Sequence, residues 1–253
     1  MDKERFDRAI ESTRQDKRQS KGIGVLGEKS LHAVVKRYME PCPENHELKI
    51  DPYIADIVSE GGIIEIQTRS FEKLRGKLEA FLSAARVTVV YPIPHIRRIS
   101  WIDPSTGETS GKRKSPKTGS FYDAFYELYK IRGLLAHPNL KILLLLVDVD
   151  DYRSLNGWGR DKKRGSSRLE RIPTGLAGEL AVGNGASGWD SLIPENLPEE
   201  FTSADYKIAA GLSLRDAQTA LNVLYHVGAV VKVGSKGRMK LYQRAKFKEK
   251  EES

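Results

Sequence analysis

Two carboxylates and an amide lie close together in residues 53–68 and have the chemistry to act on a phosphate ester. Asp56 and Glu65 belong to two short β-like runs, and Gly61-Gly62 between them is typical of a tight hairpin turn. A turn centred at this point places Asp56 opposite Glu65, with Gln67 two residues further along the same face. Two like charges in that arrangement destabilise a sheet, and a divalent cation held between them would offset the repulsion. A metal-assisted hydrolysis is one interpretation of this spacing, and a solvated pair of acids is the other.

A third acid precedes this hairpin. Glu28 lies three residues before Leu31, which begins the apolar stripe of a predicted amphipathic helix that ends before Pro41. A carboxylate at that end of the helix could approach the same site as Asp56 and Glu65.

The elements that must position these side chains form a mixed α/β pattern. Short strands are predicted at 48–50, 53–58 and 63–68, followed by a helix from Phe71 to Leu82, a strand at 87–91, a hairpin over 96–108, a helix over 121–135 and a strand at 140–149. We therefore expect a mixed α/β domain over residues 21–155, preceded by a polar arm or helix over 1–20. Residues 156–197 are basic and rich in Gly, Ser and Pro, and predict a connection without regular structure.

A second, smaller domain is predicted over residues 198–247. Thr202 with Asp205 has the pattern of a helix capping box, Gly211 suits the left-handed residue after a helix, and Ser213 can cap the next helix. The buried stripe of that second helix is expected to include Leu214. Two strands follow, over 229–233 and 238–243, with the turn expected at 234–237.

The first domain resembles the PD-(D/E)XK nuclease superfamily, also called restriction endonuclease-like. The resemblance is carried by the order helix, three strands, helix, strand over residues 21–92, with Asp56 on the second strand and Glu65-Ile66-Gln67 on the third. It implies that Asp56 and Glu65 bind Mg²⁺ or Mn²⁺, that Glu28 supports them, and that Gln67 orients the attacking water. Most members have Lys at this last position, and Gln cannot supply that positive charge. Arg69 and Lys73 are the candidates to replace it and to contact the phosphate.

The second domain resembles the winged helix-turn-helix family, which implies contacts with double-stranded DNA. The residues expected to contact DNA lie on the exposed face of the second helix and in the wing, and they are Arg215, Gln218, Thr219, Asn222, Lys232, Lys236, Arg238 and Lys240.

Composition agrees with a polyanionic partner. The chain has 253 residues with 42 Lys and Arg against 34 Asp and Glu, a net charge of +8. With one cysteine, Cys42, an intrachain disulfide and a multi-cysteine zinc site are both excluded. The first thirty residues lack the apolar run of a signal peptide and no long apolar stretch follows, so we expect a cytoplasmic protein with no membrane partner.

Two functions follow from these features. The first is a metal-dependent endonuclease that the winged helix holds on DNA, with a homodimer left open. The second is a catalytically inactive nuclease fold that acts as a DNA-binding regulator or an assembly partner.

Overall fold

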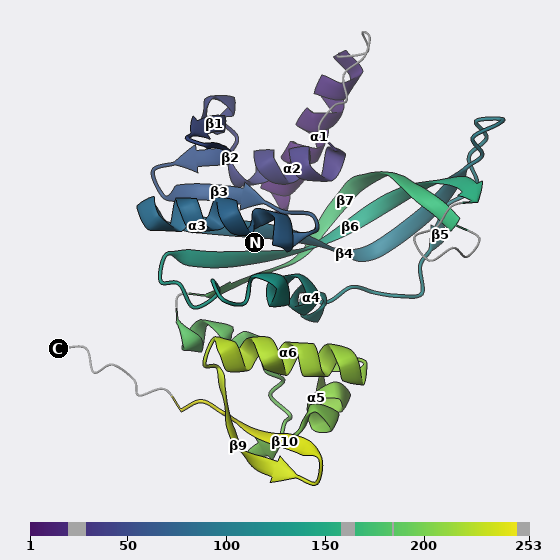
Figure 1. Cartoon of the computed structure of the whole chain (residues 1–253). Coiled ribbons are helices and arrows are strands. Elements are labelled where there is room, and N and C mark those ends of the chain that lie inside the picture. Colours follow the sequence, from purple (N-terminus) through teal and green to yellow (C-terminus); the bar gives the residue numbers. More distant parts are fainter. Residues whose placement is uncertain (20–28, 158–164, 184, 247–253) are drawn as a thin grey trace.

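The computed structural model describes residues 1–19, 29–157, 165–183 and 185–246 (Figure 1). It has a mixed α/β architecture, in which helices flank a large mixed sheet, and a smaller C-terminal unit follows the sheet. The α-helices are α1 (Lys3–Gln19), α2 (Ser30–Met39), α3 (Arg75–Ala84), α4 (Phe125–Leu128), α5 (Ser203–Ala210) and α6 (Leu214–His226). The short 3-10 helices are η1 (Pro43–Asn45), η2 (Phe71–Leu74), η3 (Phe121–Ala124), η4 (Tyr129–Ile131) and η5 (Ala186–Leu192).

The described strands form two sheets. The large sheet has the order β1-β2-β3-β4-β6-β7, with β5 paired to the outer half of β4. Its strands are β1 (His46–Ile50), β2 (Tyr53–Ser59), β3 (Gly62–Ile66), β4 (Val87–Ile102), β5 (Arg113–Lys114), β6 (Leu140–Gly157) and β7 (Gly165–Gly183). The central strands β3, β4 and β6 run parallel, and the outer strands pair antiparallel.

Each face of the sheet has its own apolar core. Helices α1 and α2 cover one face, where Phe6 packs edge-on against Tyr38 at a ring separation of 5.3 Å. On the other face α3 and α4 pack through Leu78, Phe81 and Leu128, all at most 2% exposed. Burial of these side chains is the main force that holds the helices to the sheet.

The hairpin between β2 and β3 has the expected register. Ile57 pairs with Ile64, and Ser59 pairs with Gly62. Gly62 adopts a φ of +117°, and a Cβ there would meet the carbonyl oxygen of Arg86 at 2.4 Å, so the turn requires glycine at this position.

The C-terminal unit consists of α5, α6 and the small sheet β8 (Glu200–Phe201), β10 (Met239–Arg244) and β9 (Val230–Lys236), in that order across the sheet. The expected capping box is present, since the Thr202 side chain accepts from Asp205 N and the Asp205 side chain accepts from Thr202 N. Gly211 has the left-handed φ of +64° that ends α5, and Ser213 caps α6.

Several sequence-based boundaries need correction. The segment expected to be an irregular connection contains a 19-residue strand, β7, which pairs with β6 along its whole length. As an edge strand, β7 needs few apolar side chains, which hides it from a hydrophobicity pattern. By contrast, the polar start of the chain, expected to be an arm or a helix, is the helix α1. The hairpin expected at 96–108 is also present: β4 continues to Ile102, Gly107 N donates to the Asp103 carbonyl in the turn, and Ile102 pairs antiparallel with Thr109.

The C-terminal unit also differs in two details. Leu214 is 44% exposed and so does not belong to the buried stripe of α6. The turn between β9 and β10 is the pair Gly237-Arg238, because Lys236 already pairs with Met239. Gly234 and Ser235 are therefore strand residues, and the hairpin of β9 and β10 has a tighter turn than expected.

Candidate functional site

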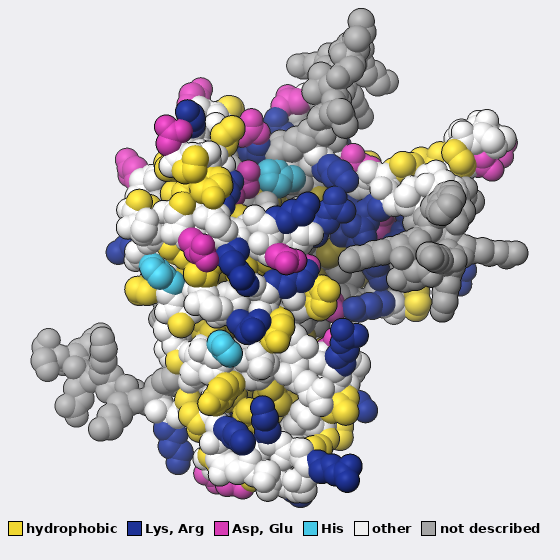
Figure 2. All heavy atoms as spheres, in the orientation of Figure 1, with side chains coloured by type: hydrophobic (Ala, Val, Ile, Leu, Met, Phe, Trp, Pro, Cys, Tyr) yellow, Lys and Arg dark blue, Asp and Glu magenta, His cyan; other side chains and the backbone are white. Residues whose placement is uncertain are grey.

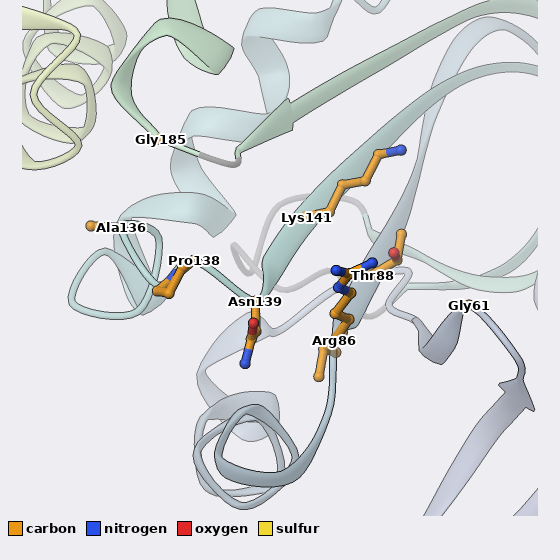
Figure 3. A pocket seen from close by; sticks show the side chains of 9 residues that line it. Gly61, Arg86, Thr88, Ala136, Pro138, Asn139, Lys141 and Gly185 are labelled. Carbon is orange, nitrogen blue, oxygen red and sulfur yellow. The ribbon is translucent and has the colours of Figure 1, made fainter. Parts of the chain in front are cut away.

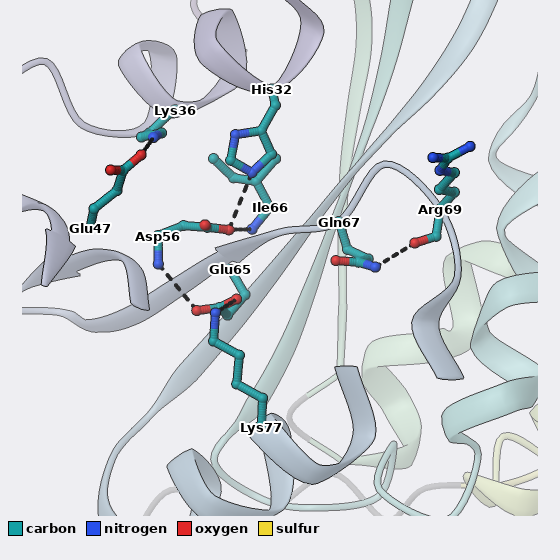
Figure 4. A network of polar contacts seen from close by, with 9 residues as sticks. All are labelled: His32, Lys36, Glu47, Asp56, Glu65, Ile66, Gln67, Arg69 and Lys77. Carbon is teal, nitrogen blue, oxygen red and sulfur yellow. Dashed lines mark hydrogen bonds and ion pairs between the residues drawn. The ribbon is translucent and has the colours of Figure 1, made fainter. Parts of the chain in front are cut away.

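The two predicted acids meet where β2 and β3 separate (Figure 4). Beyond the last paired residues, backbone N–H groups bond to carboxylates instead of to carbonyls. Asp56 N donates to Glu65 Oε1 at 3.2 Å, and Ile66 N donates to Asp56 Oδ2 at 2.7 Å. Each carboxylate is thus held by the backbone of the opposite strand, which fixes the pair in one geometry.

A lysine that the sequence analysis missed completes this pair. Lys77, on α3, places its Nζ 2.6 Å from Glu65 Oε2, and the Glu65 side chain is only 2% exposed. Burial, together with the negative charge of Asp56, raises the pKa of Glu65 to about 7, although Lys77 acts in the opposite direction. Glu65 therefore exchanges its proton near neutral pH.

Asp56 behaves in the opposite way. Burial alone would raise its pKa, but the hydrogen bond and charge of His32, the Ile66 N–H and the charge of Lys77 outweigh burial and lower the pKa of Asp56 below its usual range. His32 Nε2 lies 3.4 Å from Asp56 Oδ2. Two neighbouring carboxyls whose pKa values are driven apart are typical of a site that does acid–base chemistry.

Gln67 holds the loop that leads into α3. Its Nε2 donates to the carbonyl of Arg69 and to that of Ser70, the latter at 3.2 Å. Both donor contacts go to backbone, so the Oε1 atom is the part of this amide that can accept a hydrogen bond from a water.

These groups line one open pocket of about 370 Å³. Both cations expected near the phosphate, Arg69 and Lys73, line it as well. The full lining consists of His32, Asp56, Glu65, Ile66, Gln67, Thr68, Arg69, Ser70, Lys73, Leu74 and Lys77. Glu28, the proposed supporting acid, lies outside the described residues.

The donors present suit a hard divalent cation. Mg²⁺ is usually bound by one or two carboxylates, with waters and substrate oxygens completing its shell. Within the described residues, the Asp56 carboxylate accepts hydrogen bonds at Oδ2. Its Oδ1 atom could therefore bind a metal. The described part of the chain contains no group of three or more His, Cys, Asp or Glu side chains placed to hold a metal ion.

A larger cavity lies at the other end of the sheet (Figure 3). It measures about 680 Å³ and is lined by Arg86, Thr88 and Asn139 near the starts of the parallel strands, together with Lys141. None of the described residues that line it is acidic. Because Glu65 lies at the carboxyl end of β3, where ligands of open α/β sheets usually bind, the smaller pocket is the candidate site.

The hairpin of β9 and β10 exposes a group of positive charges. The side chains of its four expected DNA contacts, Lys232, Lys236, Arg238 and Lys240, are all exposed. On α6, Arg215 and Gln218 are exposed, while Thr219 and Asn222 are half-buried.

Helix α6 is covered on more than one side. Ala217 and Leu221 pack into its own unit, and α6 also packs against α4 and η4 of the large domain. The Thr219 hydroxyl donates to the carbonyl of Arg215 within the helix. The two exposed residues among the expected contacts, Arg215 and Gln218, both lie in the first half of α6.

Spacing marks Lys77 as a candidate cation, although its contact with Glu65 depends on how α3 packs. It follows Lys73 by four residues, so the two share one face of the helix predicted from Phe71 to Leu82. The two expected cations, Arg69 and Lys73, both lie closer to Gln67 along the chain than Lys77 does.

Comparisons with known proteins give a family without an assigned activity. The family model described as "Domain of unknown function (DUF8091)" matches residues 29–182. An uncharacterized protein of Treponema pallidum (strain Nichols) is 28% identical over 224 residues, which cover 88% of this chain and 87% of that protein. No solved structure matches the chain.

No helix in the described ranges is both long enough and apolar enough to cross a membrane.

Proposed function

The chain belongs to the family of the domain of unknown function DUF8091, and we propose that it is a nucleic-acid-binding, metal-dependent nuclease that hydrolyses phosphodiester bonds. One observation carries this proposal. The Asp56 and Glu65 carboxylates meet in an open pocket with Lys77 on one of them, where two strands separate. The resemblance of the element order to PD-(D/E)XK nucleases supports the same conclusion.

Lys77 supplies the positive charge that Gln67 cannot. In the resembled family, a lysine two residues after the acid positions the water and stabilises the transition state. Here the corresponding acid is Glu65, and the Lys77 ammonium on α3 lies 2.6 Å from its Oε2 atom. Negative charge grows on the phosphoryl oxygens during hydrolysis, and a fixed cation at that point lowers the barrier.

The hydrolysis balances with the groups in the pocket. Water attacks phosphorus, the P–O ester bond breaks, and the products are a phosphate monoester and an alcohol. Gln67 Oε1 can accept the hydrogen bond that orients the water, the proton lost by the water passes to solvent, and the leaving oxygen takes a proton from solvent. Arg69 and Lys73 line the pocket where the phosphate would lie.

Mg²⁺ or Mn²⁺, held by Asp56 Oδ1 and Glu65, would neutralise phosphate charge and make a bound water more acidic.

The C-terminal unit would hold the nucleic acid. We propose that it is a winged helix-turn-helix domain that contacts double-stranded DNA through Arg215, Gln218 and the exposed cations of the wing. These side chains are of the types that contact phosphates and base edges.

A plasmid assay tests the proposal. Supercoiled plasmid is incubated with the full chain in Mg²⁺, in Mn²⁺ and in EDTA, and nicked and linear forms are measured. We expect cleavage that requires the metal and that falls at least a hundredfold in Glu65→Gln and in Lys77→Met, since each removes a group that acts on the reacting atoms.

Matched controls separate chemistry from surface charge. Glu60→Gln and Lys49→Met make the same substitutions at exposed positions of the neighbouring strands and turn, and should cleave like the wild type. Cleavage that persists in Glu65→Gln and Lys77→Met would show that the activity arises elsewhere.

A binding protein without catalysis is the second candidate. The specific observation in its favour is the ion pair of Lys77 with Glu65, which already neutralises the buried acid within the chain. In that case the plasmid stays intact with either metal but is retarded on a gel in a salt-sensitive way.

A further inference from the structure

Next to the candidate site, the outer half of the sheet carries a cluster of arginines around one buried acid. Asp151, on β6, is fully buried and lies close to three guanidinium groups. Its Oδ2 is 3.2 Å from Arg153 Nη2 and 3.7 Å from Arg171 Nε, and its Oδ1 is 3.7 Å from Arg168 Nε. Three positive charges thus share one negative charge.

The pairing of the strands concentrates these charges. Arg171 lies directly opposite Asp151 across the β6–β7 ladder, and Arg153 lies directly opposite Arg168. Two like charges in opposed positions destabilise a sheet unless something compensates them. Dark-blue side chains gather where the long strands curve away from the helices (Figure 2).

Two further arginines add to the imbalance. Arg69, after β3, and Arg97, on β4, are both near enough to affect the ionisation of Arg168. Burial, followed by the charges of its arginine neighbours, lowers the pKa of Arg171 to about 10, although Asp151 opposes the shift. The cluster is therefore short of negative charge.

The acceptors among the described residues do not satisfy every guanidinium N–H of the cluster. The Nε atoms of Arg153 and Arg171 are buried and make no hydrogen bond within the described residues. Two other carboxylates, Asp123 and Glu170, line the pockets beside Arg171. Asp123 is 2.8 Å from Lys117 Nζ, and Glu170 accepts from Ser30 N at 2.9 Å.

A chain of pockets connects the cluster with the candidate site. Thr68 and Arg69 line both the Asp56–Glu65 pocket and a pocket beside Arg168 and Arg171. Arg171 also lines a pocket of about 220 Å³ that reaches Arg97 and Lys117. The three pockets are thus linked in series by the residues that they share.

We propose that this arginine cluster, of Arg69, Arg97, Arg153, Arg168 and Arg171, binds the backbone phosphates of the nucleic-acid strand whose scissile phosphodiester lies at Asp56 and Glu65. The proposal rests on the proposed function for the position of that scissile bond. Guanidinium forks match phosphate oxygens in pairs, which makes arginine suited to phosphate recognition. A strand supplies one phosphate per nucleotide and can occupy successive pockets, which a single inorganic phosphate cannot do.

A binding titration tests the cluster without cleavage. Fluorescent DNA, as a duplex and as a single strand, is titrated with the Glu65→Gln protein in EDTA over a series of salt concentrations. Arg168→Gln and Arg97→Gln are the variants, because Arg153 and Arg171 remain to neutralise Asp151 in both. The control is Arg8→Gln, which removes the same charge from an exposed position on α1.

Each cluster variant should raise the Kd about tenfold, because a charge-assisted contact is lost. The slope of log Kd against log salt should fall by about 0.7 to 0.9 for each lost phosphate contact. Arg8→Gln should change neither value, and thermal unfolding checks that all variants are folded.

The outcomes separate this inference from the nuclease proposal. Cleavage by the wild type with cluster variants that bind like Arg8→Gln would overturn the arginine site and leave the nuclease intact. Cluster-dependent binding without cleavage would support the arginine site and count against catalysis. Thermal stabilisation of the wild type by inorganic phosphate, with unchanged oligonucleotide affinity in the variants, would also overturn the strand-binding site.

Discussion

Replacing Glu65 with glutamine should abolish a pH dependence of stability that this residue imposes on the fold. The pKa of Glu65 is raised to about 7 from an ordinary 4.5, so the folded chain holds this proton more tightly than the unfolded chain does. Stability from this group is then fully present below about pH 4.5 and is lost as the pH rises through about 7. The loss amounts to about 3 kcal/mol, since one pKa unit corresponds to about 1.4 kcal/mol.

Urea unfolding from about pH 4.5 to about pH 8 measures this loss. Glutamine has nearly the same shape as glutamic acid and does not ionise, so Glu65→Gln should not show the loss. The difference in unfolding free energy between the two proteins should therefore change by about 3 kcal/mol across this range, and the wild type should weaken relative to the variant. For a chain of this size that is about 6–12 °C in Tm.

The exposed Glu60 in the adjoining turn provides the control, because Glu60→Gln should follow the wild type at every pH. Divalent metal should give the opposite response. Mg²⁺ displaces the proton from a ligand carboxyl, so it should stabilise the wild type near pH 7 more than it stabilises Glu65→Gln. Parallel pH curves for wild type and Glu65→Gln would refute the reasoning from burial and charge.

Two other changes should act on the C-terminal unit. Lys236→Gln combined with Arg238→Gln should weaken DNA binding about equally for all sequences and lower the salt slope by about 0.9 per lost phosphate contact, as measured by anisotropy; a change confined to one sequence would contradict a backbone role. The buried Tyr206 hydroxyl donates to the Leu192 carbonyl at 2.6 Å. Tyr206→Phe leaves this carbonyl without its partner and should lower the unfolding free energy measured in urea by about 1–3 kcal/mol. An unchanged urea midpoint would show that this buried hydrogen bond contributes little.

Local patterns predicted the hairpin and the helix caps well. The Gly61-Gly62 turn set the register that brings Asp56 to Glu65, and the Thr202 and Gly211 signals placed both ends of α5. These features depend on neighbouring residues alone, so one sequence contains the information for them.

Features that depend on distant residues were not predictable in the same way. Strand β7 has little apolar pattern of its own and forms because β6 offers it a partner along its length. The contact of Lys77 with Glu65 depends on how α3 packs on the sheet, and the sharing of Asp151 by Arg153 and Arg171 depends on the β6–β7 register. Burial and long-range charge decide these contacts, and periodicity does not report them.

Helix α6 packs between its own sheet and α4, and this packing fixes the position of the C-terminal unit relative to the large sheet. The C-terminal unit cannot swing on a tether without exposing Ala217, Leu221 and the apolar residues of α4 that share one core with them. The distance from the hairpin of β9 and β10 to the Asp56–Glu65 pocket is therefore fixed. A nucleic acid that touched both places would be cut at a set number of nucleotides from its anchoring point, giving a narrow distribution of product lengths.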